Sequence, residues 1–311
     1  MHLVLGATGG FGGAMVRALR ARNLPVRALV RDPAKARLPE GVEVVRGDAT
    51  RLGELIDAAK GCDSIIHGLN LPYAEWQPGM LALTDNVVEA SGMAGATIVF
   101  PGNVYGLKPI YNVPLPADAP TLDVSDRPNK KGHIRNMLED QLAQNAELKN
   151  IRTIIVRAGD FYGPGVDNGL IGPMIRGPLT GKPVPWYGPR SVAHPVVYID
   201  DVATAAVGLL LTPDRPTFEM VGVSGDVFTG DEWAAALGKA SGKPATLKEV
   251  PHWQVKLMGL FNRDAREFGE LLYQWEGPLQ LDDSKTRKLL PDWRPTPVED
   301  ALAATYAWYR A

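Results

Sequence analysis

The chain begins with a short apolar run that is followed at once by a glycine-rich turn. Residues 3–5, Leu-Val-Leu, predict a buried strand, and the apolar periodicity of residues 14–19 predicts a helix. Between them, Gly6, Gly9 and Gly12 have the spacing G-x-x-G-x-x-G. A strand, a tight glycine turn and a helix form the first half of a dinucleotide-binding unit, because backbone N–H groups at the helix N-terminus can then approach a pyrophosphate.

The residues of this turn are therefore expected to bind a dinucleotide cofactor. The alternative is a glycine-rich turn that holds no ligand. The expected cofactor-binding residues of the turn are Gly6, Thr8, Gly9, Gly10, Phe11 and Gly12.

Strands and helices alternate through the first half of the chain, which predicts an α/β fold with a Rossmann-like, doubly wound parallel sheet. A proline-rich connection from about residue 107 to 128 interrupts the pattern, and its length is typical of a functional loop. The predicted strands lie at residues 26–30, 42–45, 64–67, 97–100 and 151–156, and the helical patterns lie near residues 10–22, 51–60, 77–95 and 128–147.

The alternation ends after residue 156, which predicts a smaller, mostly helical C-terminal lobe that binds substrate. Thr229 and Glu232 form a capping box at the start of one helix, and Thr296 is the expected N-cap of the last one. We expect a dinucleotide-binding domain of residues 1–164 plus about 190–228, and a substrate lobe of about 165–189 plus 229–311.

The composition argues against several classes of partner. The chain has 33 basic and 35 acidic residues and a formal charge of −2, which argues against binding to nucleic acid or to a membrane surface. Cys62 is the only cysteine, so no intrachain disulfide can form and a reducing compartment is expected. We expect a soluble cytoplasmic protein, a monomer or a homodimer, without a bound metal.

The residue that ends the second predicted strand indicates which cofactor is used. A 2′-phosphate requires positive charge at this point, and Arg31 supplies it. Asp32 follows directly and is the residue type that favours NAD. We expect NADP as the cofactor, with NAD as the alternative. The alternative for Arg31 itself is a solvated surface arginine that binds no cofactor.

Three later motifs carry a resemblance to a known family. They are Val-Tyr-Gly at residues 104–106, Arg-Ala-Gly-Asp-Phe-Tyr-Gly-Pro at residues 157–164, and Val-Tyr-Ile-Asp-Asp-Val-Ala at residues 197–203. Together with the glycine turn they resemble the NAD(P)-dependent epimerase/dehydratases, which are extended and atypical short-chain dehydrogenase/reductases. The resemblance spans nearly the whole chain and implies a nicotinamide cofactor and a small-molecule substrate.

The resemblance also assigns the ends of the third and fourth predicted strands to the cofactor. It implies that Asp48 and Ala49 lie beside the adenine, and that Leu69 and Asn70 pass the ribose and nicotinamide. Asp48 could instead cap the following helix. His67 is expected to be a packed core residue rather than a catalyst.

The catalytic residues of the family are absent from this chain. The family uses a Ser or Thr four residues before the tyrosine of Val-Tyr-Gly, where this chain has Pro101. It also uses Tyr-x-x-x-Lys on the next helix, where this chain has Lys131 and Arg135. The chain therefore lacks both the tyrosine phenol and the Ser or Thr hydroxyl of the usual mechanism at these positions.

Lys131 is the expected replacement for the phenol. Lys131, Arg135 and Glu139 are four residues apart and share one helix face. The pattern resembles the isoflavone-reductase-like branch, which implies a catalytic lysine. A free lysine has a pKa of about 10.4, and burial, like charges and a helix N-terminus are the features that lower such a value. The alternatives are that Lys131 only bonds the nicotinamide ribose or is solvated.

Other polar and aromatic residues are weaker candidates. Asn103 could donate to a developing oxyanion, and Tyr105 could exchange a proton or simply pack in its turn. The resemblance implies that Asp160 and Tyr162 face the nicotinamide. Aromatic residues that could line a substrate site are Tyr73, Trp76, Tyr111, Trp186 and Tyr187.

These observations favour an NADP(H)-dependent oxidoreductase or isomerase of atypical short-chain type that acts on a small carbonyl or conjugated substrate. One alternative is a nucleotide-sugar epimerase or dehydratase. The other is a regulator that binds the dinucleotide without turnover.

Overall fold

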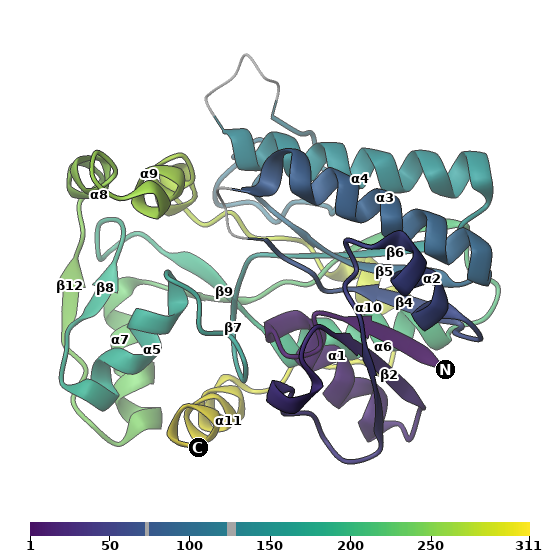
Figure 1. Cartoon of the computed structure of the whole chain (residues 1–311). Coiled ribbons are helices and arrows are strands. Elements are labelled where there is room, and N and C mark those ends of the chain that lie inside the picture. The colour runs from purple at the N-terminus through teal and green to yellow at the C-terminus, as the bar shows by residue number, and fades with distance from the viewer. Residues whose placement is uncertain (72–74, 123–128) are drawn as a thin grey trace.

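The computed structural model describes residues 1–71, 75–122 and 129–311 as an α/β protein with a large sheet and a smaller lobe beside it (Figure 1). Within these ranges seven parallel strands form the large sheet, in the order β10-β6-β5-β4-β1-β2-β3. They are β1 (His2–Leu5), β2 (Val26–Val30), β3 (Val42–Arg46), β4 (Ser64–His67), β5 (Thr97–Asn103), β6 (Thr153–Ala158) and β10 (Phe218–Gly222). The predicted doubly wound parallel sheet is confirmed.

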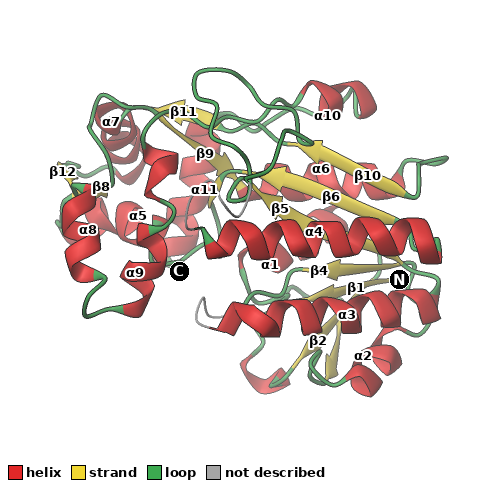
Figure 2. Cartoon of the chain, turned by 90° about the horizontal axis from the view of Figure 1, so that it is seen from above, coloured by secondary structure: helices red, strands yellow, loops and turns green. Residues whose placement is uncertain are grey.

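Helices cover both faces of this sheet (Figure 2). The apolar sides of α1 and α6 pack on one face, and those of α2, α3 and α4 pack on the other. Their bounds are α1 (Gly10–Ala21), α2 (Leu52–Ala59), α3 (Trp76–Ala94), α4 (Lys130–Lys149) and α6 (Ile199–Leu211). No helix in the described ranges is long and apolar enough to cross a membrane.

The strand order places a switch point at β1. From β1 the chain runs outward to β2 and β3, and it then returns to the other side of β1 to form β4. Ligands of such sheets bind at the carboxyl ends of the strands where the direction of winding reverses. The glycine turn after β1 lies at this point.

The smaller lobe is built around buried aromatic side chains. Trp186, Trp233 and Trp275 are at most 2% exposed, and the rings of Trp186 and Trp275 meet edge to face at 4.8 Å. The strands of this lobe are β7 (Asp160–Tyr162), β8 (Val184–Trp186), β9 (His194–Tyr198), β11 (Asp226–Phe228) and β12 (Leu247–Glu249). Its helices are α5 (Ile171–Thr180), α7 (Gly230–Ser241), α8 (His252–Met258), α9 (Arg263–Gly269) and α11 (Val298–Arg310). The domain boundaries expected from the sequence stay predictions.

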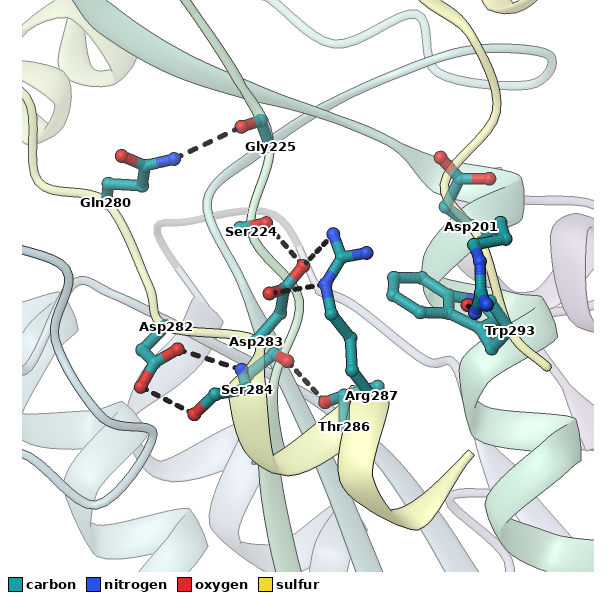
Figure 3. A network of polar contacts seen from close by, with 12 residues as sticks. Asp201, Ser224, Gly225, Gln280, Asp282, Asp283, Ser284, Thr286, Arg287 and Trp293 are labelled. Carbon is teal, nitrogen blue, oxygen red and sulfur yellow. Dashed lines mark hydrogen bonds and ion pairs between the residues drawn. The ribbon is translucent and has the colours of Figure 1, made fainter. Parts of the chain in front are cut away.

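A polar network fixes the short helix α10 (Ser284–Leu289) to the end of β10 (Figure 3). The hydroxyl of Thr286 donates to the carbonyl of Gly222, and that of Ser224 donates to the carboxylate of Asp283 at 2.6 Å. Arg287 donates twice to the same carboxylate, at 2.9 and 2.8 Å. These bonds anchor α10 to β10, the outer strand of the large sheet.

The described part of the proline-rich connection, residues 107–122, is tied to the rest of the molecule. Leu107 and Thr121 form a bridge with each other, and Leu115 pairs with Leu281. Leu115 and Leu122 are buried in a small apolar cluster. Residues 123–128, the remainder of the expected loop, lie outside the described residues.

Several local predictions from the sequence are confirmed, and others are not. The capping box of Thr229 and Glu232 is present at the start of α7. β5 continues three residues beyond its predicted end and includes Pro101. The sequence analysis missed the short strands β7, β8, β9, β11 and β12, which lie beyond the region where strands alternate regularly with helices.

The predicted N-cap of the last helix is wrong. Helix α11 begins at Val298 with Pro297 as its N-cap, and no side chain caps it. The hydroxyl of Thr296 donates instead to the carboxylate of Asp201 on α6 at 2.6 Å, and its backbone N–H donates to the same group. Asp201 is 6% exposed, and burial raises its pKa despite these bonds. A buried carboxylate requires donors, and this tertiary contact outcompetes a local cap.

We expect Thr296→Val to lower the free energy of unfolding by about 1–3 kcal/mol, because the buried carboxylate loses a donor while the side chain keeps its shape. Thr212→Val is the control, since Thr212 at the other end of α6 donates only to a backbone carbonyl in a half-exposed position. Urea unfolding measures both changes. Equal losses in the two variants would contradict a special role for Asp201.

Candidate active site

Backbone contacts between glycines bring three segments together at the switch point. Gly6 has a φ of +71°, and a Cβ there would lie 2.5 Å from the carbonyl oxygen of Gly68. A Cβ at Gly12 would overlap the carbonyl oxygen of Gly6, and one at Gly68 would lie 2.7 Å from that of Leu5. The turn after β1, the first turn of α1 and the loop after β4 can pack this closely only because these positions lack side chains.

The N-terminus of α1 is open toward this turn. Gly9 is the N-cap, its amide donates to the carbonyl of Gly6 at 2.9 Å, and no side chain caps the helix. The first-turn N–H groups therefore point out of the helix end, beside the exposed Thr8 and Gly9. A Cβ at Gly9 would meet only one atom, at 3.3 Å, so the backbone leaves room for a ligand. This geometry fits a pyrophosphate.

Gly10 and Phe11 are the two remaining expected residues of the turn. A Cβ at Gly10 would touch Ile199 and Val166 at 3.2 and 3.3 Å, which places Gly10 in a packed contact. The side chain of Phe11 is 7% exposed and belongs to the core between α1 and the sheet. Only its backbone N–H can reach a ligand.

Arg31 and Asp48 lie close together at the carboxyl ends of β2 and β3. Bonds from the backbone and hydroxyl of Thr50 lower the pKa of Asp48, and the charge of Arg31 lowers it further. Asp48 does not cap α2, because its carboxylate accepts these bonds within its own turn. Asp32 accepts from the amide of Ala34 and begins a single helical turn, Pro33–Lys35. Arg31 is exposed.

The remaining expected cofactor residues line the same edge. Ala49 is buried, and its carbonyl accepts from Asn86 at 3.0 Å. Leu69 is half-buried and Asn70 is exposed in the loop after β4. His67 is fully buried and bonds Thr84 at 2.9 Å, as expected for a core residue, and burial lowers its pKa to about 3.

The start of α4 is joined to the Val-Tyr-Gly turn. Asn129 caps the helix by accepting from the amide of Gly132 at 2.9 Å, and its amide group donates to the carbonyl of Tyr105 at 2.6 Å. The hydroxyl of Tyr273 donates to the same carbonyl at 2.6 Å. The two segments that carry the expected catalytic residues therefore form one hydrogen-bonded unit.

Asn103 and Tyr105 already make contacts within their own turn. The side-chain oxygen of Asn103 accepts from the amide of Tyr105 at 3.0 Å, so only the NH₂ group can donate to an oxyanion. The side chain of Tyr105 is half-buried between two apolar clusters.

Lys131 is buried and paired with a carboxylate from the smaller lobe. Its ammonium lies 2.7 Å from the carboxylate of Glu267 on α9, and the side chains are 2% and 12% exposed. Burial acts to raise the pKa of Glu267, but the hydrogen bond and charge of Lys131 outweigh it, so the pKa is lowered. The solvated alternative for Lys131 is wrong. The sequence analysis missed Glu267, which belongs to no motif.

Trp76 and Arg135 complete the surroundings of the ammonium. The Lys131 ammonium lies 5.4 Å from the centre of the Trp76 ring, and the Arg135 guanidinium lies 4.9 Å from it. Arg135 also donates to the carbonyl of Pro101 at 3.3 Å. Lys131 and Arg135 thus share one helix face, as predicted. One turn farther on, Glu139 pairs with Arg157 in the core.

Asp160 and Tyr162 point into the lobe rather than toward an open site. Tyr162 is fully buried against Trp233, and burial raises its pKa. Asp160 pairs with His194 at 2.9 Å, and the His194 ring stacks on Trp275 at 3.8 Å. The implied role of Tyr162 beside the nicotinamide is therefore wrong, because β7 turns its side chain into the lobe core.

Two of the aromatic residues expected to line a substrate site are buried, and two others contact neighbouring residues. Trp76 and Trp186 are 1% exposed, so neither offers a surface to a substrate. The hydroxyl of Tyr111 donates to the carbonyl of Tyr273 at 2.6 Å. Tyr187 packs on Phe268, the neighbour of Glu267. Tyr73 lies outside the described residues.

The chain belongs to the NAD dependent epimerase/dehydratase family, whose model matches residues 2–223. The proteins of known activity that resemble the chain in sequence include two reductases. It is 31% identical over 220 residues to a 3-diazoavenalumate denitrifying reductase from a Streptomyces species, which covers 66% of this chain and 70% of that protein.

A second curated relative is an NAD(P)H azoreductase from Xenophilus azovorans, 25% identical over 258 residues, or 82% of this chain and 79% of that protein. Among solved structures, UDP-glucuronic acid 4-epimerase from Bacillus cereus in complex with NAD aligns with a TM-score of 0.76 at 20% identity. This alignment covers 99% of this chain and 98% of the epimerase. At that identity it establishes the fold alone.

Proposed function

We propose that this protein is an NAD(P)H-dependent reductase of a small conjugated acceptor, a carbonyl or an N=N bond, with Lys131 as the proton donor. The observation that carries the proposal is the buried ammonium of Lys131, which stands where the family has its phenol. When bound, a nicotinamide cofactor supplies a hydride, so reduction of either acceptor needs one further proton. An ammonium can provide that proton where neither Tyr nor Ser is present.

The cofactor is proposed to lie at the switch point. The first-turn N–H groups of α1 would bind the pyrophosphate, and Asp48 would accept from the adenine. The exposed guanidinium of Arg31 suits a 2′-phosphate, since it can bond a phosphate through two N–H groups. Asp32 is used locally as a helix cap, which weakens the argument for NAD.

The names of the two curated relatives support the acceptor class. One is a reductase of a diazo compound and the other an azoreductase, and both names describe N–N multiple bonds. Sugar epimerisation, by contrast, needs a base that removes a hydroxyl proton, and the ammonium of Lys131 is already paired with Glu267. A nucleotide-sugar epimerase stays one alternative, and the other, a non-catalytic sensor, is tested by the turnover assay described below.

The glycine turn is tested by Gly9→Val. A branched side chain would occupy the space in front of the α1 N-terminus, so NADPH binding should weaken at least about 100-fold while the protein stays folded. Gly53→Val on α2 is the control, since a Cβ at Gly53 has no atom within 4 Å. Calorimetric titration with unchanged affinity in Gly9→Val would exclude the turn as the cofactor site.

The choice of cofactor is tested by Arg31→Ala. Loss of a charge-assisted hydrogen bond should weaken NADPH binding by about 1.5–3 kcal/mol, and NADH binding should hardly change. Arg37→Ala, also at an exposed arginine, is the control. Equal weakening of both cofactors would mean that Arg31 does not bind the 2′-phosphate.

The proton donor is tested by Lys131→Gln. The amide can still donate to Glu267 but carries no transferable proton, so turnover should fall by about 10²–10⁴-fold. The exposed neighbour Lys130→Gln is the control. NADPH oxidation is followed with aromatic carbonyl, azo and diazo acceptors, and NADPH binding is measured in parallel. If Lys131→Gln turns over an acceptor as fast as the unsubstituted protein, Lys131 is not the proton donor. If the unsubstituted protein binds NADPH but reduces no acceptor, the result favours a non-catalytic sensor.

A further inference from the structure

Glu267 on α9 and Glu270, the residue directly after this helix, hold the first turn of α4. Glu267 lies 2.7 Å from the ammonium of Lys131, and Glu270 accepts from the backbone N–H of Lys130 at 2.9 Å. Glu267 and Glu270 are three residues apart, so they share one side of the helical segment. Helix α9 belongs to the smaller lobe, and α4 packs on the large sheet (Figure 2). The start of α4 is therefore held from the lobe.

The two contacts differ in what they bind. Glu270 is half-buried and meets a backbone amide, which carries no charge. Glu267 meets an ammonium that is only 2% exposed. A buried ammonium requires a countercharge and hydrogen-bond acceptors, because it has lost most of its water. Glu267 supplies both, and a charged bond in a poorly solvated place also fixes the direction of the donor.

Glu267 brings a negative charge to a part of the described structure that is rich in positive charge. Positive charge predominates on the α4 side, where Lys130 and Arg135 flank Lys131, and Arg266 adds to it from α9. Burial acts to raise the pKa of Glu267, but the hydrogen bond and charge of Lys131, with the charges of Lys130 and Arg266, lower it, so Glu267 is a carboxylate at neutral pH. Glu270, which directly follows α9, accepts from a backbone N–H rather than from an ammonium.

We propose that Glu267 is a positioning residue that orients and balances the Lys131 ammonium for proton donation. This rests on the proposed function, in which Lys131 is the donor. The ammonium–carboxylate pair takes the place of the phenol and lysine that other members of the family use. Because its carboxylate comes from the lobe, the donor is aligned only when α9 lies on α4.

The test compares Glu267→Gln with Glu270→Gln in the full-length protein. Each substitution keeps an oxygen acceptor and removes one charge, from α9 in Glu267→Gln and from the residue after α9 in Glu270→Gln. In Glu267→Gln we expect kcat to fall by about ten- to a hundredfold, part of the 10²–10⁴ that a general acid contributes, with KM changed less than about threefold. The alkaline limb of the kcat profile should move to lower pH, because the carboxylate that lies 2.7 Å from the ammonium is lost. In Glu270→Gln this limb should stay in place, and Glu267→Asp should restore part of kcat.

Three results would overturn the inference. Parent values of kcat and of the alkaline limb in Glu267→Gln, with turnover still lost in Lys131→Gln, would leave the proposed function intact and Glu267 without a role. If both glutamine variants lose the same amount of kcat and the alkaline limb of the pH profile does not move, Glu267 only helps to hold α9 against α4. A Glu267→Asp variant as inactive as the Gln variant, with the same limb, would show that charge is not what matters.

A second measurement needs no substrate and separates this inference from the proposed function. Acetic anhydride labels amines only in their neutral form, and peptide mass spectrometry gives the fraction of Lys131 acetylated at each pH. The Glu267→Gln variant should label Lys131 at lower pH than the parent, and Glu270→Gln should match the parent. Identical labelling in all three would overturn the inference even if the parent reduces no acceptor. Thermal unfolding of each variant establishes that it is folded.

Discussion

The contact among Gly6, Gly12 and Gly68 is the constraint on which the site depends. At this contact backbone packs directly on backbone, and a Cβ added at Gly6 would lie only 2.5 Å from the carbonyl oxygen of Gly68. No side chain can be added at these positions without separating α1 from β1 or the β4 loop from the turn. The contact lies where the sheet changes its direction of winding, and the open end of α1 lies at the same point. The close approach of these backbones thus places the helix end at the carboxyl edge of β1 and β4.

The second half of the site is built at the seam between the sheet and the lobe. The carbonyl of Tyr105 accepts from Asn129 of the α4 cap and from Tyr273 of the lobe. The Lys131 ammonium extends the same connection to α9. The site is therefore assembled from segments that are far apart in sequence, and each contributes one or two polar groups.

The sequence alone predicted the sheet well because its apolar strands alternate regularly with helices in that region. Arg31 and Asp48 were each predicted at the end of a strand, and the structure brings them together because parallel strands end at one edge. Lys131 was found because it occupies a known position in a motif. The lobe was harder to predict, since β7 and β8 have only three residues each.

Tertiary contacts account for the errors. Thr296 has the spacing of a helix cap, but a buried carboxylate on α6 takes its hydroxyl. Glu267 lies 136 residues from Lys131 and has no neighbouring motif, so only the fold brings them together. Tyr162 follows the family pattern, but β7 turns it inward against Trp233.

The bond between Thr296 and Asp201 has a mechanical consequence. It joins the lobe to α6 on one face of the sheet, whereas Glu267 joins the lobe to α4 on the opposite face (Figure 1). The first attachment lies next to a proline and contains no pair of opposite full charges, and the second is an ion pair. Loss of the charge on Glu267 would therefore weaken the attachment at α4 and leave the one at α6 in place.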